Sequence, residues 1–161
     1  MAMIIPTGSL FVDRGDASSN DCKACVLAAS SEILKHCPND EGVIIWYESC
    51  YLKYMDADFF GKIDEDQLSM WNLNNVSMIE PQKLDQMVHE LLANLSQKAS
   101  ETPKMFARGE LKINESLKIH GMVQCSRDTS DVDCQKYIRS MFSGSCYVRY
   151  DIHPFITLYI N

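Results

Sequence analysis

The chain has 161 residues, of which 46% are apolar and 23% are charged, a composition typical of a globular protein and not of a disordered one. The net charge of −7 argues against binding to nucleic acid or to an anionic membrane surface, because no basic stripe is available to neutralise phosphates. No apolar run is long enough to span a membrane, and residues 1–6 lack the basic and long apolar regions of a secretory signal.

The first third of the chain predicts a helix followed by a strand. Ser18 and Asp21 form a start that resembles a capping box, and an apolar stripe at i, i+3 and i+4 follows, so we predict a helix over about 20–36. Residues 43–54 are rich in Val, Ile, Trp and Tyr and predict one long strand. Residues 55–80 lack clear periodicity, and we expect an inter-domain linker with a short strand there.

Pro81 opens the second part of the chain at the start of another predicted helix. The elements predicted there, in chain order, are a helix at 82–99, a strand at 104–111, a turn at 114–116, a strand at 117–125, a short helix at 131–142 and a strand at 145–158. Because helices and strands segregate instead of alternating as βαβ units, we predict an α+β fold with helices packed on one face of an antiparallel β-sheet.

An internal repeat organises the chain. Residues 13–25 align with residues 125–137, and residues 49–54 align with residues 145–150 in the same order. The second copy is 16 residues shorter between its two motifs. We therefore predict two partial copies of one fold in tandem.

The cysteine spacing of both copies resembles a known signature. Cys125, Cys134 and Tyr137 match the C-x8-C-x2-C spacing of the plant ginkbilobin-homologous (salt-stress-response/antifungal) domain, with Tyr in place of the last cysteine. The first copy carries the same signature with Asp13 in place of its first cysteine and Cys22 as its second. The resemblance runs from about residue 10 to residue 155 and includes the string His-Gly-Met-Val-Gln-Cys at 120–125.

Tandem copies of this domain are found in plant cysteine-rich repeat secretory proteins and in the ectodomains of cysteine-rich receptor-like kinases. The resemblance implies a partial first domain at 1–57, a linker at 58–80 and a second domain with an internal deletion at 81–161. It also implies two helices on a five-stranded antiparallel sheet in each complete copy. Here the first copy lacks the opening strands, the first helix and the N-terminal cysteine, and the second copy lacks most of its second helix.

Seven cysteines favour a disulfide framework, and their odd number leaves at least one sulfur without an intramolecular partner. The resemblance implies two bridges, Cys25–Cys50 and Cys125–Cys134. It leaves three cysteines unpaired, and these are Cys22, Cys37 and Cys146. Losing several native disulfides is expected to weaken the fold or to favour disulfide shuffling.

Zinc is the competing chemistry for the sulfurs of the first copy. Cys22 and Cys25 form a C-x2-C half-site, which Cys37 and Cys50 could complete as an all-thiolate tetrahedral set. A second C-x2-C is absent from the sequence, and a thioredoxin-like role would need a βαβ setting that the pattern does not supply. We therefore assign neither a metal site nor a cofactor.

A mannose-binding member of the family uses an Asn, an Arg and a Glu. The Arg and Glu positions fall on Ile44 and Met55 in the first copy and on Ser140 and Asp151 in the second, so we do not carry the activity over and leave the ligand unknown. An aromatic sugar platform is a second possibility. In one long strand Trp46 and Tyr54 would share one face and Tyr47 and Tyr51 the other, although core packing explains them better.

The sequence offers no catalytic motif, because it contains no G-x-S-x-G, phosphate-binding loop or dinucleotide fingerprint, and its four histidines are scattered. We therefore predict that the protein is not an enzyme. Three N-x-S glycosylation sequons, at Asn75, Asn94 and Asn114, fit a secreted origin.

Three functions remain open. The first is a non-enzymatic extracellular-type binding module related to plant stress and defence proteins, secreted by resemblance, with a carbohydrate or another extracellular domain as partner. The second is a truncated, inactive remnant of a secretory protein or receptor-like kinase, for which the missing signal leaves an intracellular location open. The third is a small zinc-binding adaptor.

Overall fold

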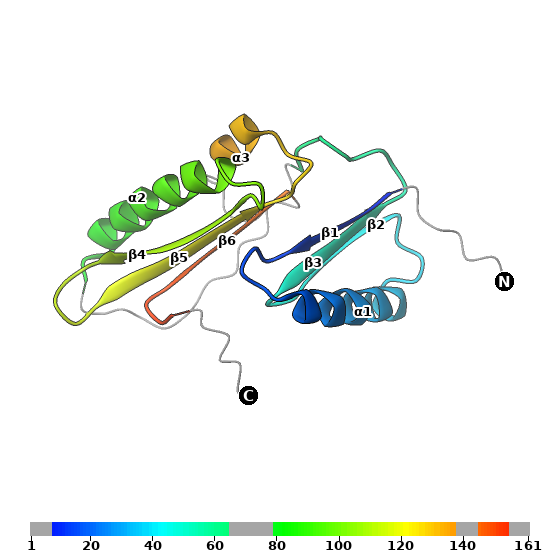
Figure 1. Cartoon of the computed structure of the whole chain (residues 1–161), viewed down its shortest axis with the longest axis horizontal. Helices are drawn as coiled ribbons and strands as arrows, with labels where there is room; N and C mark the ends of the chain where they lie inside the picture. The colour runs from blue at the N-terminus through cyan, green and yellow to red at the C-terminus, as the bar shows by residue number, and fades with distance from the viewer. Residues whose placement is uncertain (1–7, 65–78, 138–144, 155–161) are drawn as a thin grey trace.

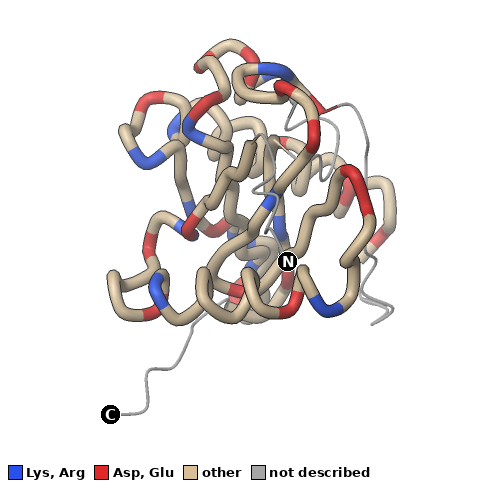
Figure 2. Tube along the Cα trace, turned by 90° about the vertical axis from the view of Figure 1, so that its right-hand side faces the viewer, with Lys and Arg blue, Asp and Glu red and all other residues tan. Residues whose placement is uncertain are grey.

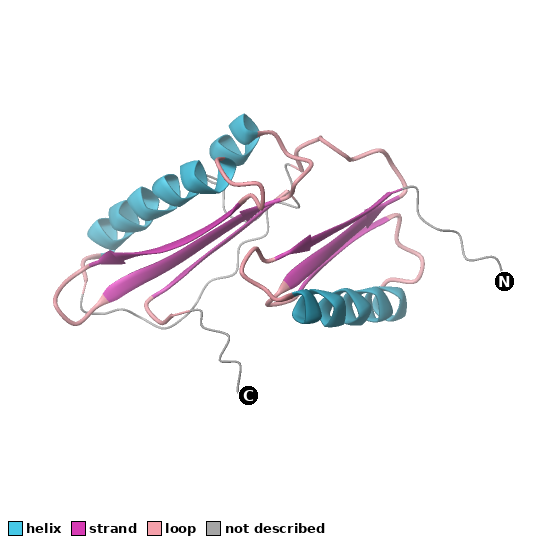
Figure 3. Cartoon of the chain, in the orientation of Figure 1, coloured by secondary structure: helices cyan, strands magenta, loops and turns pink. Residues whose placement is uncertain are grey.

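The computed structural model describes residues 8–64, 79–137 and 145–154, which form two three-stranded antiparallel sheets, each with a long helix on one face (Figure 1). Figure 3 shows the two long helices on opposite outer sides of the molecule, with the strands between them. The α+β prediction, with helices on one face of antiparallel sheets and two partial copies in tandem, is confirmed.

The N-terminal half contains one long helix and three strands. In chain order these are β1 (Gly8–Asp13), α1 (Ser19–His36), β2 (Gly42–Trp46) and β3 (Cys50–Met55), and the order in the sheet is β1-β3-β2. The Ser18 side chain accepts a hydrogen bond from the backbone N–H of Asp21, which caps the first turn of α1 as the sequence predicts. Ala29 and Ile33 of α1 pack on Leu52 of β3.

The prediction of one long strand over 43–54 is wrong, because this segment is a hairpin of β2 and β3. The backbone N–H of Tyr47 donates to the carbonyl of Cys50 at 2.8 Å and closes a short polar loop through Glu48 and Ser49. The loop contains no Gly, Pro, Asn or Asp, which are the usual markers of a turn. The apolar residues on both sides therefore read as one continuous strand.

The segment after β3 folds back without a strand in its described part, residues 56–64. Lys53 of β3 is buried and pairs with Asp64 at 2.8 Å between nitrogen and oxygen, and its ammonium lies 4.9 Å from the centre of the Phe59 ring. These contacts hold the start of the expected linker against the first sheet. The short strand expected in this region would have to fall within 65–78, which lies outside the described residues.

The C-terminal half contains two helices and three strands. In chain order these are α2 (Pro81–Ser100), β4 (Phe106–Lys112), β5 (Lys118–Cys125), α3 (Asp131–Tyr137) and β6 (Cys146–Asp151), and the order in the sheet is β4-β5-β6. The predicted helix from Pro81 and the turn at 114–116 are confirmed. The predicted end of α3 falls within 138–144, outside the described residues. The predicted strand at 145–158 is too long, because β6 ends at Asp151 and residues 152–154 are not part of a strand.

The core of the C-terminal half lies between α2 and its sheet. Two glycines let the helix approach closely: a Cβ at Gly121 would lie 2.9 Å from Leu91 Cδ2, and one at Gly109 would lie 3.1 Å from Leu95 Cδ2. The apolar face of α2 that packs there consists of Val88, Leu91, Leu92, Leu95 and Ala99.

The sequence repeat is also a repeat of strand register. Asp13 lies opposite Cys50 in the pair β1–β3, and the aligned residues Cys125 and Cys146 lie opposite each other in β5–β6. Around this shared pair each copy keeps different elements. The first copy keeps β2 and α1, which packs on β2 and β3, whereas the second keeps β4 and α2, which packs on β4 and β5.

Candidate functional site

The two disulfides each join a helix to a sheet. Cys25 of α1 is bonded to Cys50 of β3, with the two Cα atoms 6.1 Å apart. Cys125, at the end of β5, is bonded to Cys134 of α3, with the Cα atoms 5.8 Å apart. Cys125 and Cys134 are completely buried, so this bond is part of the core of the C-terminal half.

Three cysteines carry free thiols, and all three have a raised pKa. Partial burial, together with a hydrogen bond to the Asp13 carboxylate, raises the pKa of Cys22 to about 11. Desolvation and the neighbouring Asp40 raise the pKa of Cys37. Burial, with smaller contributions from nearby carboxylates, raises the pKa of Cys146 to about 12. None of the three is therefore an activated thiolate at neutral pH.

The four sulfurs proposed as a zinc set are not together. Cys25 and Cys50 are bonded to each other, while Cys22 lies in the first turn of α1 and Cys37 caps its other end, about 22 Å away by the rise of a helix. The described residues include all seven cysteines and contain no group of three or more His, Cys, Asp or Glu side chains that could hold a metal ion. The geometry gives no support to a zinc-binding adaptor.

The two copies meet where the loop after β1 reaches β4 and β5. The backbone N–H of Gly15 donates to Gln124 Oε1 at 2.8 Å, and Lys104 Nζ donates to the carbonyl of Gly15 at 2.7 Å. Asp16 pairs with Arg108 at 3.0 Å. A Cβ at Gly15 would lie 2.4 Å from Phe106 Cβ, so only glycine allows this approach.

Gln124 is central to this contact because it is 2% exposed and both the nitrogen and the oxygen of its side-chain amide form hydrogen bonds. Its Nε2 donates to the carbonyls of Lys104, Met105 and Cys125, at 2.8, 3.2 and 3.0 Å. Its Oε1 accepts from Gly15 of the other copy. This role of Gln124 was not predicted from the sequence. The available signal was a polar amide placed directly before a cysteine in an otherwise apolar strand.

A second set of bonds connects the segment after β3 to the C-terminal half. Gly61 has a positive φ of 68° and donates its N–H to Asp128 Oδ2 at 2.9 Å. The N–H of Asp64 donates to Ser145 Oγ at 3.1 Å. Within the described parts of the chain, these hydrogen bonds and the ion pair connect the N-terminal half to the C-terminal half.

The aromatic residues do not form an open sugar platform. Trp46 lies opposite Tyr51 in the β2–β3 register, so these two share a face, and the faces predicted from one long strand are wrong. Together with Tyr47 and Tyr147, they line a cavity of about 10 Å³ between the copies, which has room for about one water molecule and none for a sugar ring. Tyr54 is elsewhere and donates its hydroxyl to the carbonyls of Cys37 and Asp40.

The residues at the family's sugar-binding positions belong to two different sheets, and those of the first copy are apolar. Ile44 is half-buried in β2, and Met55 ends β3. Asp151 belongs to the other sheet, where its carboxylate accepts a hydrogen bond from the N–H of His153. Ser140 lies outside the described residues.

Acidic and basic residues are interspersed along the described Cα trace (Figure 2). Within the same residues, none of the helices has the length and apolar character needed to cross a membrane.

Comparisons with known proteins agree with this arrangement. Residues 8–57 match the family described as salt stress response/antifungal. The chain is 40% identical over 160 residues to an antimicrobial ginkbilobin-2-like protein of Castanea crenata, and 36% identical over 162 residues to cysteine-rich repeat secretory protein 38 of Arabidopsis thaliana. Each match covers 89% of this chain, and the chain spans 66% and 63% of these relatives.

Two solved structures share the fold. One is the tandem DUF26 ectodomain of the Arabidopsis thaliana cysteine-rich receptor-like protein PDLP8, with a TM-score of 0.68 and 22% identity over 87% of this chain and 71% of that one. The other is the corresponding ectodomain of PDLP5, with a TM-score of 0.66 and 18% identity over 93% of this chain and 80% of that one.

Proposed function

Because the chain belongs to the salt stress response/antifungal family of plant cysteine-rich proteins, we propose that it is a non-enzymatic, extracellular-type binding module of the stress or defence response. The observation that carries this proposal is the pair of disulfides that join helix to sheet in both halves. Such bonds form and persist in oxidising compartments. The names of the relatives, which are secretory or antimicrobial proteins, support the same location.

Another extracellular protein domain suits the surface better than a carbohydrate does. Leu27 and Leu34 of α1 are 72% and 61% exposed, and Phe11 of β1 is 38% exposed. In the C-terminal half, α2 covers β5, the strand equivalent to β1, whereas α1 packs on β2 and β3 and leaves the helix side of β1 open. Exposed apolar side chains on α1 and β1 favour a protein partner.

The extracellular assignment is tested by directing the chain into the secretory pathway behind an added signal peptide. Peptide maps of the purified product are then compared with and without reduction. We expect bonded Cys25–Cys50 and Cys125–Cys134 peptides and three alkylated cysteines. A folded product with seven free thiols would contradict the proposal. A product that lacks a cooperative thermal transition would instead support the inactive remnant.

An antimicrobial role is the narrower form of this proposal, and it rests on the name of the Castanea crenata relative. Oxidised protein is added to growing fungal hyphae, beside protein that has been reduced and alkylated as the matched control. We expect the oxidised form alone to slow growth. Equal effects of both forms would overturn this narrower role while leaving the extracellular assignment intact.

A further inference from the structure

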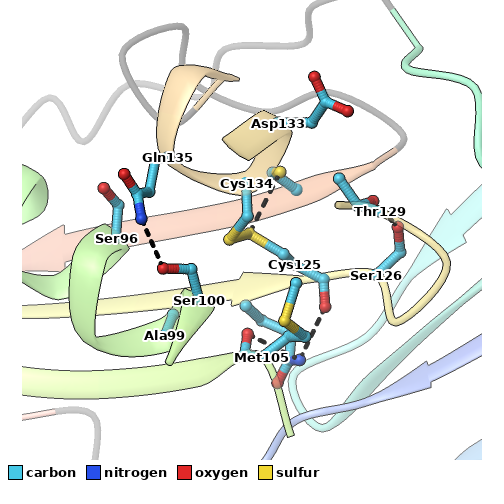
Figure 4. Close-up of a disulfide and its surroundings, with 12 residues drawn as sticks. Ser96, Ala99, Ser100, Met105, Cys125, Ser126, Thr129, Asp133, Cys134 and Gln135 are labelled. Atoms are coloured by element: carbon cyan, nitrogen blue, oxygen red, sulfur yellow. Dashed lines mark hydrogen bonds between the residues drawn. A yellow bond between two sulfur atoms is a disulfide. The ribbon is translucent and has the colours of Figure 1, made fainter. Parts of the chain in front are cut away.

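Three sulfur atoms lie together at the end of the C-terminal sheet. Cys125 and Cys134 are bonded to each other, as Figure 4 shows, and the Sγ atom of the free Cys146 lies 3.4 Å from that of Cys125. All three residues are buried, with exposed fractions of 0%, 0% and 1%. The free thiol is therefore held against the disulfide by the core itself.

The backbone is also suited to a bond between Cys125 and Cys146. These residues face each other in the β5–β6 register. The N–H of Cys125 points to the other side, toward the carbonyl of Met105, and the next bond to β6 joins the N–H of Ser126 to Ser145. Cys125 and Cys146 are thus a non-hydrogen-bonded pair, whose Cα atoms lie about 4.5 Å apart, within the range that a disulfide can bridge.

The first copy does not contain this arrangement. Asp13 occupies the position aligned with Cys125 and faces Cys50, which is bonded to Cys25 of the helix. The first copy therefore has no sulfur across the strands from Cys50. The three-sulfur cluster is a property of the second copy.

We propose that Cys125, Cys134 and Cys146 form a thiol–disulfide exchange site, in which the Cys125–Cys134 bond interconverts with a Cys125–Cys146 bond. The Cys146 thiol loses its proton, and the thiolate attacks the sulfur of Cys125. The bond from Cys125 to Cys146 forms as the bond to Cys134 breaks, and Cys134 leaves as a thiolate that takes up a proton. The number of disulfides stays constant, so the reaction consumes no oxidant or reductant.

Exchange is slow at neutral pH. The groups around the Cys146 thiol are Asp128 of the loop after β5, Asp133 of α3 and the buried phenol of Tyr51 from β3. With burial as the main cause, the pKa of Cys146 is about 12, so only about one thiol in 10⁵ is ionised at pH 7. The exchange rate is expected to rise about tenfold for each pH unit below that pKa.

Exchange would change the attachment of α3. In the present bonding, α3 is tied to the end of β5 through Cys134, and Gln135 Nε2 donates to Ser100 Oγ of α2 at 2.8 Å (Figure 4). After exchange, the covalent tie joins two adjacent strands and Cys134 becomes a free thiol on the helix. That thiol can then attack the disulfide of oxidised glutathione, forming a mixed disulfide on Cys134 as reduced glutathione leaves. This inference does not depend on the partner or the role proposed above.

The test uses the full chain with the remaining free thiols removed as C22S/C37S, so that intermolecular shuffling does not confuse the result. Oxidised protein is incubated at pH 7, 8, 9 and 10, quenched with acid, alkylated and mapped without reduction. We expect Cys125–Cys146 peptides with alkylated Cys134, in a fraction independent of protein concentration, at a rate that rises about tenfold per pH unit. Cys125–Cys134 as the sole isomer at every pH would overturn the proposal.

Two matched variants examine each bond separately. In C134S, incubation with oxidised glutathione is expected to give the Cys125–Cys146 disulfide, whereas in C146S the Cys125–Cys134 disulfide stays unchanged at every pH. If C134S folds, as judged by circular dichroism, and yet carries glutathione on Cys125 or Cys146 in place of the bond between them, the proposal is wrong. If C134S does not fold, the pH series in the C22S/C37S protein decides alone.

Discussion

Asp13 shows how a lost cysteine is replaced at the level of a single side chain. In the repeat, Asp13 aligns with Cys125 and Cys22 aligns with Cys134. Cys125 and Cys134 form a disulfide, whereas Cys22 forms a hydrogen bond to the Asp13 carboxylate. One carboxylate oxygen, Oδ1, is buried without a hydrogen-bond partner among the described residues. Asp13 and Cys22 are therefore in contact, as the two cysteines of a disulfide would be, but no covalent bond joins them.

Restoring the cysteine with D13C is expected to form a bond to Cys22. A disulfide that closes a loop of this length stabilises a fold by about 2–3 kcal/mol. Urea unfolding of the oxidised variant would measure the gain, with D13C/C22S as the control that cannot form the bond. Equal stabilities of D13C and D13C/C22S would contradict the expectation.

The pH dependence of Cys22 follows from the same contact. A raised pKa means less thiolate at a given pH, so at pH 9 Cys22 should react with iodoacetamide about 50-fold more slowly than an ordinary half-ionised thiol. D13N removes the negative charge and the charged acceptor, which lowers the pKa of Cys22 and speeds the reaction. Cys37 in the same sample is the internal control, because its rate should not change.

At the scale of single elements, the packing of α2 on β5 depends on Gly121. Because a Cβ there would lie 2.9 Å from Leu91 Cδ2 and 3.0 Å from Leu95 Cδ1, G121A forces two buried leucines to move. We expect a loss of about 1–3 kcal/mol in the free energy of unfolding. The adjacent G109A, with its nearest contact at 3.1 Å, should cost less. A smaller loss for G121A than for G109A would show that α2 adjusts easily.

A double variant separates overpacking from an effect on the strand itself. L91A creates a cavity, and the methyl group added by G121A fills part of it. We expect the loss in L91A/G121A to be smaller than the sum of the two single losses.

The helices were the part of the fold most accessible from the sequence. Ser18 and Pro81 mark helix starts, and the apolar stripes behind them continue for several turns, so both long helices are predicted within about a turn. The β2–β3 hairpin was missed because Glu48 and Ser49 carry no turn signal. The turn is fixed by the pairing of β2 with β3, and these two strands have similar compositions, so the sequence does not show where one ends and the other begins.

The site was less accessible, because its contacts join residues far apart in the chain. Spacing alone does not pair seven cysteines, and the two bridges were proposed from a family resemblance. Gln124 and Gly15 are 109 residues apart, and no local pattern connects them. The contact of Cys146 with Cys125 depends on strand register, which a 16-residue deletion in the repeat made hard to anticipate.

At the scale of the whole molecule, Gln124 couples the two copies. Q124A would leave the N–H of Gly15 and the carbonyls that Nε2 now satisfies without these partners in a buried place. Leaving buried polar groups unsatisfied costs about 1–3 kcal/mol each, so we expect a loss of at least 2 kcal/mol, measured by thermal unfolding. R108A, which removes an exposed ion pair between the copies, should change stability by less than about 1 kcal/mol. Similar losses in the two variants would place the coupling elsewhere.

The common strand register of the two halves has a consequence for how such a chain tolerates deletion. Among the described residues, the antiparallel pair β1–β3, or β5–β6, and the start of the helix that follows its first strand occur in both halves, whereas the other flanking elements differ. A pair of strands stapled to one neighbouring helix is thus the smallest unit that both halves preserve. Elements on either side of that unit can be deleted, provided that the other half supplies hydrogen-bond partners for the polar groups that the deletion exposes.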